Sequence, residues 1–440
     1  MAIAAAPERL SAENLKELRD EIEKRTGKSP EELYEERDRR VRDAIALKEP
    51  DRVPVGFRGV YFATRYAGLP HSAVFYDPAA HKAAVIKTLM DFEPDLFRFT
   101  PFIGAESGPA LEILDAKDTR WPGFNLSADS THQFVEEERM QADEYDLFLS
   151  DPTDFVLRYY LPRAYGALEP LSRLPSLTDR FTGFPAMTPI FTREEFKQVA
   201  RSLFRAGQEK AKYSQQEREI AQLGFPPLTY PGGAGGSPFE TLTGRMRTMR
   251  GIMTDMYRQP DKLLAACEKL AAINIAKATP ADPTQKWNPR RVAGGGILTG
   301  ADNYMSKKQF ETFYWPTCKK AMQASIDLGF VPSPFLEARC DDRLEYLLEL
   351  PKGKLLIQFE QTDMARAKDI LRDHACIFGN VPPILLDTGS PQEVEEYCQK
   401  LIKTCAKGGG FILGNGSAMD RAKPENVKAM IDSAKKYGWY

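Results

Sequence analysis

The sequence lacks the features that mark several common classes of protein. Its six cysteines include no C-x-x-C pair, so neither a disulfide framework nor a zinc ribbon is predicted. No apolar run approaches the ~20 residues needed to cross a bilayer. The first six residues are too short and too uncharged for a secretory signal. We therefore expect a cytoplasmic protein that does not associate with a membrane.

An excess of basic residues is also missing. The chain has 60 lysines and arginines against 62 aspartates and glutamates, a formal net charge of −2. Nucleic-acid binders need surplus cations to contact phosphates, so nucleic acid is not an expected partner. The four histidines, His71, His81, His132 and His374, are scattered without a ligand spacing, and a histidine-rich metal site is not predicted.

Two nucleotide-binding signatures are absent as well. No Gly-x-Gly-x-x-Gly follows the first expected strand, which argues against a doubly wound dinucleotide fold. The glycine-rich loop 232–236 has no Gly-Lys-Ser/Thr after it, so it is not a nucleotide P-loop. Its free N–H groups could cradle another anion, but we favour a tight turn or lid.

What the sequence does have is an alternation of short apolar runs and amphipathic helices, which is most regular in its last third. Its period there is roughly 25–35 residues, the length of a βα unit. This rhythm predicts an α/β protein of the (β/α)8 barrel type over residues 48–440, with a charged helical extension over 1–47. The expected strands are at 51–57, 95–99, 226–230, 334–336, 354–359, 375–378 and 411–413.

The pattern breaks up between about 104 and 190, which we interpret as enlarged loops that could cover a site. Tyr61, Phe62, Trp121 and Phe124 follow the ends of early strands and suggest an aromatic-walled pocket, with ordinary loop packing as the alternative. A long helix is expected from Thr192 to near Gly224, because a capping-box pattern precedes its apolar face.

The corner at 334–347 carries the most chemistry, because a short apolar strand ends there and a charged segment leads into a helix. In parallel α/β proteins the reactive groups lie at the carboxyl ends of strands. Glu337 and Cys340 could be metal ligands. Alternatively, Glu337 pairs with Arg339, and Cys340 is a small buried side chain.

Two other strand ends hold candidate residues. Arg58, behind the first expected strand, could hold a substrate carboxylate with its guanidinium fork, or it could form a salt bridge at the rim. Asp363, at the end of a later strand, is either an acid of the site or, as we favour, a helix N-cap.

Four segments of the chain, in this order, resemble the uroporphyrinogen decarboxylase family. They are Asp51-Arg52-Val53-Pro54-Val55, Gly379-Asn380-Val381-Pro382, residues 408–413 and residues 424–430. The resemblance covers about residue 35 to the end of the chain. It implies a (β/α)8 barrel, and the family includes both decarboxylases of haem synthesis and methylcobamide-dependent methyltransferases.

Departures from each branch indicate which one is closer. The decarboxylases carry an arginine-rich segment after the first strand, and residues 58–65 keep only part of that charge; the decarboxylases' C-terminal histidine has no counterpart here. The methyltransferases hold zinc with a His-x-Cys pair and a later cysteine. Those positions fall on Glu337-Ala338-Arg339 and on Ser417, so a thiolate-rich zinc site is not expected, while an oxygen-rich site at Glu337 stays open.

The resemblance therefore implies a corrinoid-dependent methyltransferase that acts on a small, methoxylated aromatic donor. Cobalamin would be free or on a partner corrinoid protein, Glu337 and Asp363 would be catalytic, and a homodimer is considered. The alternatives are decarboxylation of a tetrapyrrole or smaller polycarboxylate held by Arg58, Arg65 and Arg339, and a barrel that only binds or delivers a corrinoid. The expected substrate-binding residues are Arg58, Tyr61, Phe62, Trp121, Arg339, Asn380 and Ser417.

Overall fold

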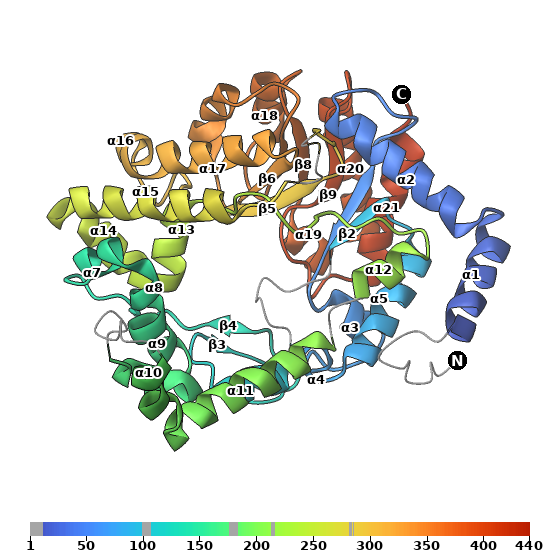
Figure 1. Cartoon of the computed structure of the whole chain (residues 1–440). Helices are drawn as coiled ribbons and strands as arrows, with labels where there is room; N and C mark the ends of the chain where they lie inside the picture. Colours follow the sequence, from blue (N-terminus) through green and yellow to red (C-terminus); the bar gives the residue numbers. More distant parts are fainter. Residues whose placement is uncertain (1–11, 99–106, 176–183, 213–215, 281–283, 285) are drawn as a thin grey trace.

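A parallel sheet forms the centre of the computed structural model, which describes residues 12–98, 107–175, 184–212, 216–280, 284 and 286–440 (Figure 1). Seven strands are hydrogen-bonded in the order β2-β1-β9-β8-β7-β6-β5, and every pair is parallel. The predicted α/β class with a parallel sheet is therefore confirmed. The strands are β1 Val55–Arg58, β2 Leu96–Arg98, β5 Val292–Ile297, β6 Val331–Leu336, β7 Leu356–Phe359, β8 Cys376–Val381 and β9 Phe411–Asn415.

The strand expected at 226–230 forms only an isolated bridge between the two edges of this sheet. The Leu228 N–H donates to the Phe97 carbonyl of β2 at 2.8 Å, and the Tyr230 N–H donates to the Val292 carbonyl of β5 at 2.8 Å. Pro226 and Pro227 have no N–H to donate, which prevents a longer ladder here. The two sheet edges nevertheless lie on either side of this segment.

Helices follow the strands, as expected for βα units (Figure 1). Their apolar sides and the strands share one large hydrophobic cluster. Ser306 and Ser390 form capping boxes with Gln309 and Glu393, the residues three positions after them. These helices are α5 Pro78–Phe92, α15 Pro260–Lys277, α16 Lys307–Gln309 with the π-helix η5 Phe310–Tyr314, α17 Trp315–Asp327, the 3-10 helix η6 Asp341–Glu349, α18 Met364–Leu371, α19 Pro383–Thr388, α20 Pro391–Cys405 and α21 Pro424–Tyr437.

Two N-terminal helices, α1 Ala12–Thr26 and α2 Pro30–Ile45, precede the sheet. α2 starts with a capping box of Ser29 and Glu32. Its residues Val41, Ala44 and Ile45 are buried in one cluster with residues from the start of the strands, so α2 covers the amino end of the sheet. The carboxyl end is left for the site.

A helical lobe is inserted after β2, in the region where the sequence pattern broke up (green in Figure 1). The long helix expected up to Gly224 is two helices, and Leu203, expected on its apolar face, is 48% exposed. No helix in the described part of the chain is long and apolar enough to cross a bilayer. The segment between β2 and α15 contains α6 Gly108–Leu114, the antiparallel pair β3 Thr119–Arg120 and β4 Gln133–Phe134, α7 Tyr145–Ser150, α8 Pro152–Phe155, the π-helix η1 Val156–Tyr160, α9 Leu161–Ala164, the 3-10 helix η2 Gly166–Arg173, α10 Phe184–Phe191, α11 Glu194–Ala211, α12 Gln216–Ala221 (which lies beside α5), α13 Pro238–Thr241, the π-helix η4 Leu242–Arg247 and α14 Thr248–Arg258.

Candidate active site

Arg58 lies at the carboxyl end of β1, and side chains from two other strands hold its guanidinium. Its Nη1 donates to Gln358 Oε1 of β7 at 3.1 Å, and the Gln358 Nε2 donates to Ser333 Oγ of β6 at 2.7 Å. The guanidinium lies 4.0 Å from the centre of the Phe335 ring, a cation–π contact. Burial and the nearby charge of Arg98 lower the pKa of Arg58 to about 9.

No described residue forms an ion pair with Arg58 within 4.0 Å, and Arg58 is only 5% exposed. The rim salt bridge considered from the sequence is therefore not formed among these residues. A buried guanidinium of this kind suits an anionic group of a ligand, because a bidentate carboxylate would supply the missing counter-charge.

Glu337, directly after β6, is half-buried at the same end of the sheet. Burial, and then the neighbouring carboxylate of Glu360, raise the pKa of Glu337, while Arg58 opposes the shift. The Glu337–Arg339 pair considered from the sequence is not present. The Arg339 side chain is 69% exposed and its Nε lies 3.1 Å from Asp341 Oδ2, because the chain turns between the two residues.

That turn also fixes the position of Glu360 at the end of β7. Ala338 has a left-handed backbone with φ of 60°, and its N–H donates to Glu360 Oε2 at 2.7 Å. The Glu360 N–H in turn donates to the Leu336 carbonyl at 3.1 Å. Two carboxyl groups from adjacent strands are thus held near each other, which favours the protonated form of Glu337.

A third carboxyl group, Glu240 of α13, belongs to the same electrostatic environment. Its Oε1 accepts hydrogen bonds from the N–H groups of Leu298 and Thr299 and from the Tyr314 hydroxyl, each at 2.8 Å. Burial raises the pKa of Glu240, and its charge adds to the upward shift at Glu337. Sequence reasoning missed Glu240, because α13 is too short for a periodic signal.

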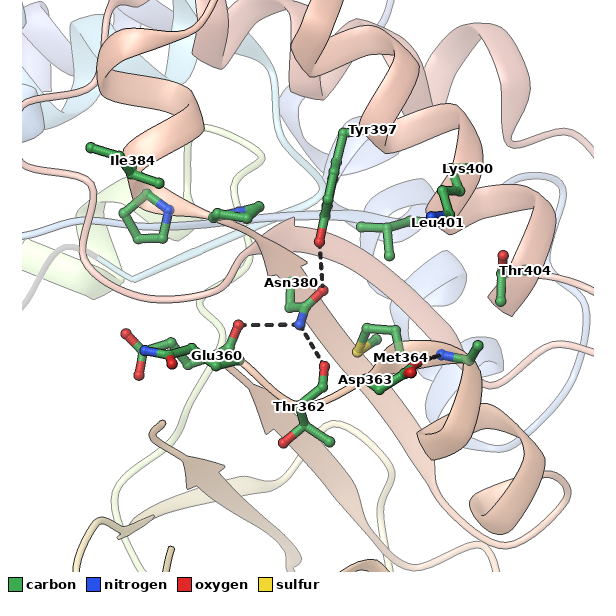
Figure 2. Close-up of a pocket in the computed structure, with 14 residues that line it drawn as sticks. Glu360, Thr362, Asp363, Met364, Asn380, Ile384, Tyr397, Lys400, Leu401 and Thr404 are labelled. Carbon is green, nitrogen blue, oxygen red and sulfur yellow. Dashed lines mark hydrogen bonds between the residues drawn. The ribbon is translucent and has the colours of Figure 1, made fainter. Parts of the chain in front are cut away.

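A cavity of about 770 Å³ lies beside this cluster, at the ends of β7 and β8 (Figure 2). Asn380 lies at its centre: its Nδ2 donates to the carbonyls of Glu360 at 3.1 Å and Thr362 at 2.9 Å. Tyr397 of α20 donates its hydroxyl to Asn380 Oδ1 at 3.4 Å. Asp363 also lines the cavity, so the structure brings Asn380, Asp363 and Glu360 together.

The Asp363 carboxylate is already used by the helix that follows it. Its Oδ1 accepts from the N–H groups of Ala365 at 2.8 Å and Arg366 at 3.2 Å, so Asp363 is the N-cap of α18. The favoured interpretation from the sequence is confirmed. A catalytic role for Asp363 stays a prediction.

Ser417, beyond β9, is held next to Arg58 through Asn415. The Asn415 Nδ2 donates to the carbonyls of both Arg58 and Ser417, each at 2.6 Å, and its Oδ1 accepts from the Arg58 N–H. These hydrogen bonds of Asn415 join the ends of β1 and β9. Ser417 is half-buried at that junction.

The residues at this corner do not fit a zinc ion. Cys340 is fully buried, its Sγ lies 3.7 Å from the Glu337 carbonyl, and burial raises the pKa of its thiol. A zinc site needs three or four protein ligands, and Glu337 and Cys340 would supply two. Among the described residues, no group of three or more His, Cys, Asp or Glu could hold a metal.

The aromatic wall suggested by the sequence is not an open surface. Tyr61 and Phe62 are at most 1% exposed, and the Tyr61 hydroxyl lies 2.8 Å from His132 Nδ1. Trp121 is 1% exposed, and its Nε1 donates to the Tyr76 hydroxyl at 3.1 Å. Phe124, stacked on Trp121, is 58% exposed. Tyr61, Phe62 and Trp121 are members of buried hydrophobic clusters. Their rings therefore pack against other side chains and do not line an open pocket.

Comparisons with known proteins agree with this architecture. Residues 227–437 match the family model described as uroporphyrinogen decarboxylase (URO-D). A methyltransferase from Methanosarcina mazei has a similar fold, with a TM-score of 0.55 and 13% identity over 90% of this chain and 98% of that chain. The matches to the family model and to its curated relatives support a divergent member of the uroporphyrinogen decarboxylase family, with the family match lying in residues 227–437.

Two curated relatives are both named uroporphyrinogen decarboxylase. The protein from Chlorobium phaeobacteroides is 24% identical over 190 residues, 41% of this chain and 50% of its own length. The protein from Chlorobium phaeovibrioides is 33% identical over 78 residues, 17% of this chain and 22% of its own length. The chain thus matches half or less of the length of these relatives.

Proposed function

We propose that the protein is a methyltransferase that moves a methyl group from a small methoxylated aromatic donor to a corrinoid. The observation that carries this proposal is the position of Glu337, a half-buried residue at the carboxyl end of the sheet. Burial and the nearby Glu360 raise the pKa of its carboxyl group. A carboxyl group whose pKa is raised keeps its proton up to a higher pH, which suits a general acid. The leaving oxygen of a methyl ether requires such a proton.

In the proposed reaction the carbon–oxygen bond of the donor breaks as its methyl group passes to the corrinoid's cobalt(I). The oxygen keeps the electron pair of the broken bond and takes the proton of Glu337, so the demethylated phenol leaves neutral. The corrinoid is a second substrate here, free or presented by a partner protein. The cavity beside Asn380 is large enough for a single-ring aromatic donor.

The proposal includes a complete (β/α)8 barrel over residues 48–440, with 1–47 as its N-terminal extension. The bridge made by Leu228 and Tyr230 between β2 and β5 supports it, because it occupies the place of an eighth strand. In such a barrel the loops at the carboxyl ends of the strands form the active site.

The test is a methyl-transfer assay with purified protein, chemically reduced cob(I)alamin and a methoxybenzoate. We expect the absorbance of methylcobalamin to rise with release of an equal amount of the phenol, and Glu337→Gln to lose this activity. If the protein neither methylates cob(I)alamin nor binds a corrinoid protein, the proposal is rejected.

A second candidate is decarboxylation of a tetrapyrrole or smaller polycarboxylate, favoured by the buried Arg58 with Arg98 close to it. The other clamps expected from the sequence support it less. Arg339 is exposed and paired with Asp341, and the Arg65 Nη1 lies 3.5 Å from the Ala422 carbonyl. Release of carbon dioxide from uroporphyrinogen would support this candidate, and unchanged substrate would reject it.

A further inference from the structure

Arg139, between β4 and α7 of the helical lobe, is a buried cation with unused hydrogen-bond donors. It is 2% exposed, and its Nε and Nη2 are buried without a hydrogen-bond partner among the described residues. Its Nη1 donates to the Glu137 carbonyl at 3.3 Å. The nearest carboxylate oxygen, Glu137 Oε2, lies 3.8 Å from Nη2, which is too far for a hydrogen bond. A buried charge in this state favours an added anion.

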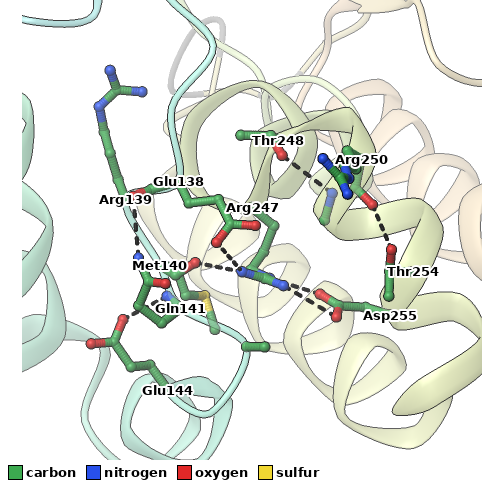
Figure 3. A network of polar contacts seen from close by, with 12 residues as sticks. Glu138, Arg139, Met140, Gln141, Glu144, Arg247, Thr248, Arg250, Thr254 and Asp255 are labelled. Atoms are coloured by element: carbon green, nitrogen blue, oxygen red, sulfur yellow. Dashed lines mark hydrogen bonds and ion pairs between the residues drawn. The ribbon is translucent and has the colours of Figure 1, made fainter.

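Arg247, in the same lobe, is a buried arginine whose guanidinium nitrogens all donate hydrogen bonds. Figure 3 shows the Glu138 side chain turned toward Arg247, whereas Arg139 points away from that network. Arg247 donates to both carboxylate oxygens of Asp255, at 2.7 and 3.2 Å, and to the Met140 carbonyl at 2.7 Å. All guanidinium nitrogens of Arg247 therefore donate hydrogen bonds, whereas Nε and Nη2 of Arg139 donate none to a described residue and its ion pair is the 3.8 Å contact with Glu137.

A second arginine, Arg245, lies on a segment that is hydrogen-bonded to the backbone of Arg139. The Arg139 N–H donates to the Met246 carbonyl at 2.9 Å, which places the π-helix η4 alongside it. Arg245, one residue earlier in η4, is 44% exposed in its side chain, and its Nη1 lies 3.2 Å from Asp118 Oδ2. A buried guanidinium and a rim guanidinium thus lie on adjoining segments.

Two tyrosines share the electrostatic environment of these arginines. Tyr160 and Tyr165 are half-buried, and neither hydroxyl hydrogen-bonds to a described residue. Burial raises the pKa of both, and the charges of Arg245 and Arg139 act in the opposite direction on each. The Lys117 N–H, beside Asp118, donates to the Ala164 carbonyl at 3.0 Å, which places Tyr165 near the arginine pair.

The positions of Tyr160 and Arg245 depend on irregular helix geometry. Tyr160 is the last residue of the π-helix η1, and Arg245 lies within the π-helix η4. A π-helical turn changes the direction of its side chains relative to an α-helix, and such turns occur frequently at functional sites. Two of them supply residues to this one cluster.

We propose that Arg139, Arg245, Tyr160 and Tyr165 form a binding site for a small organic carboxylate. The planar fork of Arg139 at the base matches two carboxylate oxygens, and the phenol groups and Arg245 would donate from the rim. The side chains of Asp118 and Glu137 lie beside the arginines and repel a phosphate dianion more than a singly charged carboxylate. A carboxylate is therefore the favoured anion.

The experiment is isothermal titration calorimetry of the full chain with sodium benzoate at constant ionic strength. We expect Arg139→Gln to weaken benzoate binding at least tenfold and Arg245→Gln at least fivefold. Arg250→Gln is the matched control, because Arg250 is an exposed arginine of the adjoining helix (Figure 3), and it should bind as the wild type does. Equal loss in all three variants, or none, would overturn the proposal.

Two further measurements keep the test decisive if Arg139→Gln does not fold. Tyr160→Phe removes one rim hydroxyl and should weaken benzoate binding about threefold without changing the melting temperature. Inorganic phosphate at the same ionic strength should bind at least tenfold more weakly than benzoate. Unchanged binding in both rim variants, or tighter binding of phosphate, would contradict a carboxylate site.

Discussion

The guanidinium of Arg58 lies 4.0 Å from the centre of the Phe335 ring, although 277 positions separate the two residues. The ring covers one face of the cation, and Gln358 accepts from its edge at 3.1 Å. β1, β6 and β7 thereby place a single buried charge at the carboxyl end of the sheet, close enough to Glu337 to influence its pKa. Each partner of Arg58 can be tested by substitution.

Arg58→Lys keeps the charge and removes the planar fork. We expect KM for an anionic substrate to rise roughly 10–100-fold, because a hydrogen bond to a charged group is worth about 1.5–3 kcal/mol. The free energy of unfolding should fall by about 1–3 kcal/mol, since Gln358 Oε1 loses its donor. Steady-state kinetics and urea unfolding measure the two effects. Arg65→Lys is the control, and an equal effect there would contradict a special role for Arg58.

Asp95 connects the N-terminal helix α2 to the sheet, and its substitution tests that connection. Its carboxylate is 1% exposed, lies 2.6 Å from Arg40 and 2.7 Å from Arg52, and accepts from the Val55 N–H. Asp95→Asn leaves the buried guanidinium of Arg52 without its ion-pair partner, while Arg40 keeps its pair with Asp51. We expect it to lower the free energy of unfolding by roughly 3–5 kcal/mol at pH 7, as measured in urea.

The same carboxylate makes stability depend on pH. Although burial alone would raise the pKa of Asp95, the charges of Arg52 and Arg40 outweigh it and lower the pKa to about 2. The stabilisation is therefore present above the ordinary aspartate value near 3.8 and is lost as the pH falls toward 2. The Asp95→Asn protein should lose less stability over that pH range than the wild type. Parallel curves would show that Asp95 does not titrate in this way.

Trp121 and Phe124 are stacked 5.1 Å apart but differ in exposure, which makes them a matched pair. Trp121→Ala should lower the free energy of unfolding by about 3–5 kcal/mol, because the indole is buried among loop and lobe residues. Phe124→Ala, at a position 58% exposed, should cost no more than about 1 kcal/mol. Thermal melts measure both. Equally small losses of unfolding free energy in the two variants would indicate that Trp121 lines an open pocket, as the sequence predicted.

Local signals in the sequence predicted those elements that depend on local bonds. Ser29, Ser306 and Ser390 each close a capping box with a residue three positions later, so the helix starts could be read directly. The strand at 226–230 failed, because an apolar run after two prolines resembles a strand while lacking donors. The π-helices η1 and η4 were not predicted, since their sequences carry no distinct period.

The residues of the candidate site also divide into those that local sequence signals predicted and those that depend on the three-dimensional packing. Glu337 was found because it follows a clear strand, whereas its electrostatic neighbours Glu360 and Glu240 come from segments whose proximity depends on how β6, β7 and α13 pack in three dimensions. Polar residues inside otherwise apolar strands, Ser333 and Gln358, were an available signal for the inner face. The Arg139 cluster could not be predicted, because the lobe has no repeating pattern that sets which of its segments meet.

Glu337→Gln keeps the shape of the side chain and removes its proton. If Glu337 is the general acid, kcat should fall by at least the ~10²-fold typical of such a group. Stability at pH 7 should change by no more than about 1 kcal/mol, because burial already disfavours the carboxylate that is lost. Glu345→Gln, the same change at an exposed position of η6, should leave both quantities unchanged.

The pH profile separates a general acid from a residue that only shapes the pocket. Because burial and Glu360 raise the pKa of Glu337 above 4.5, the proton is present at low pH and is lost as the pH rises through that raised value. The wild-type kcat should therefore fall on the alkaline side of this pKa, and the residual activity of Glu337→Gln should lack that limb. A shared alkaline limb in the two proteins would assign it to another group and remove Glu337 from the proton transfer.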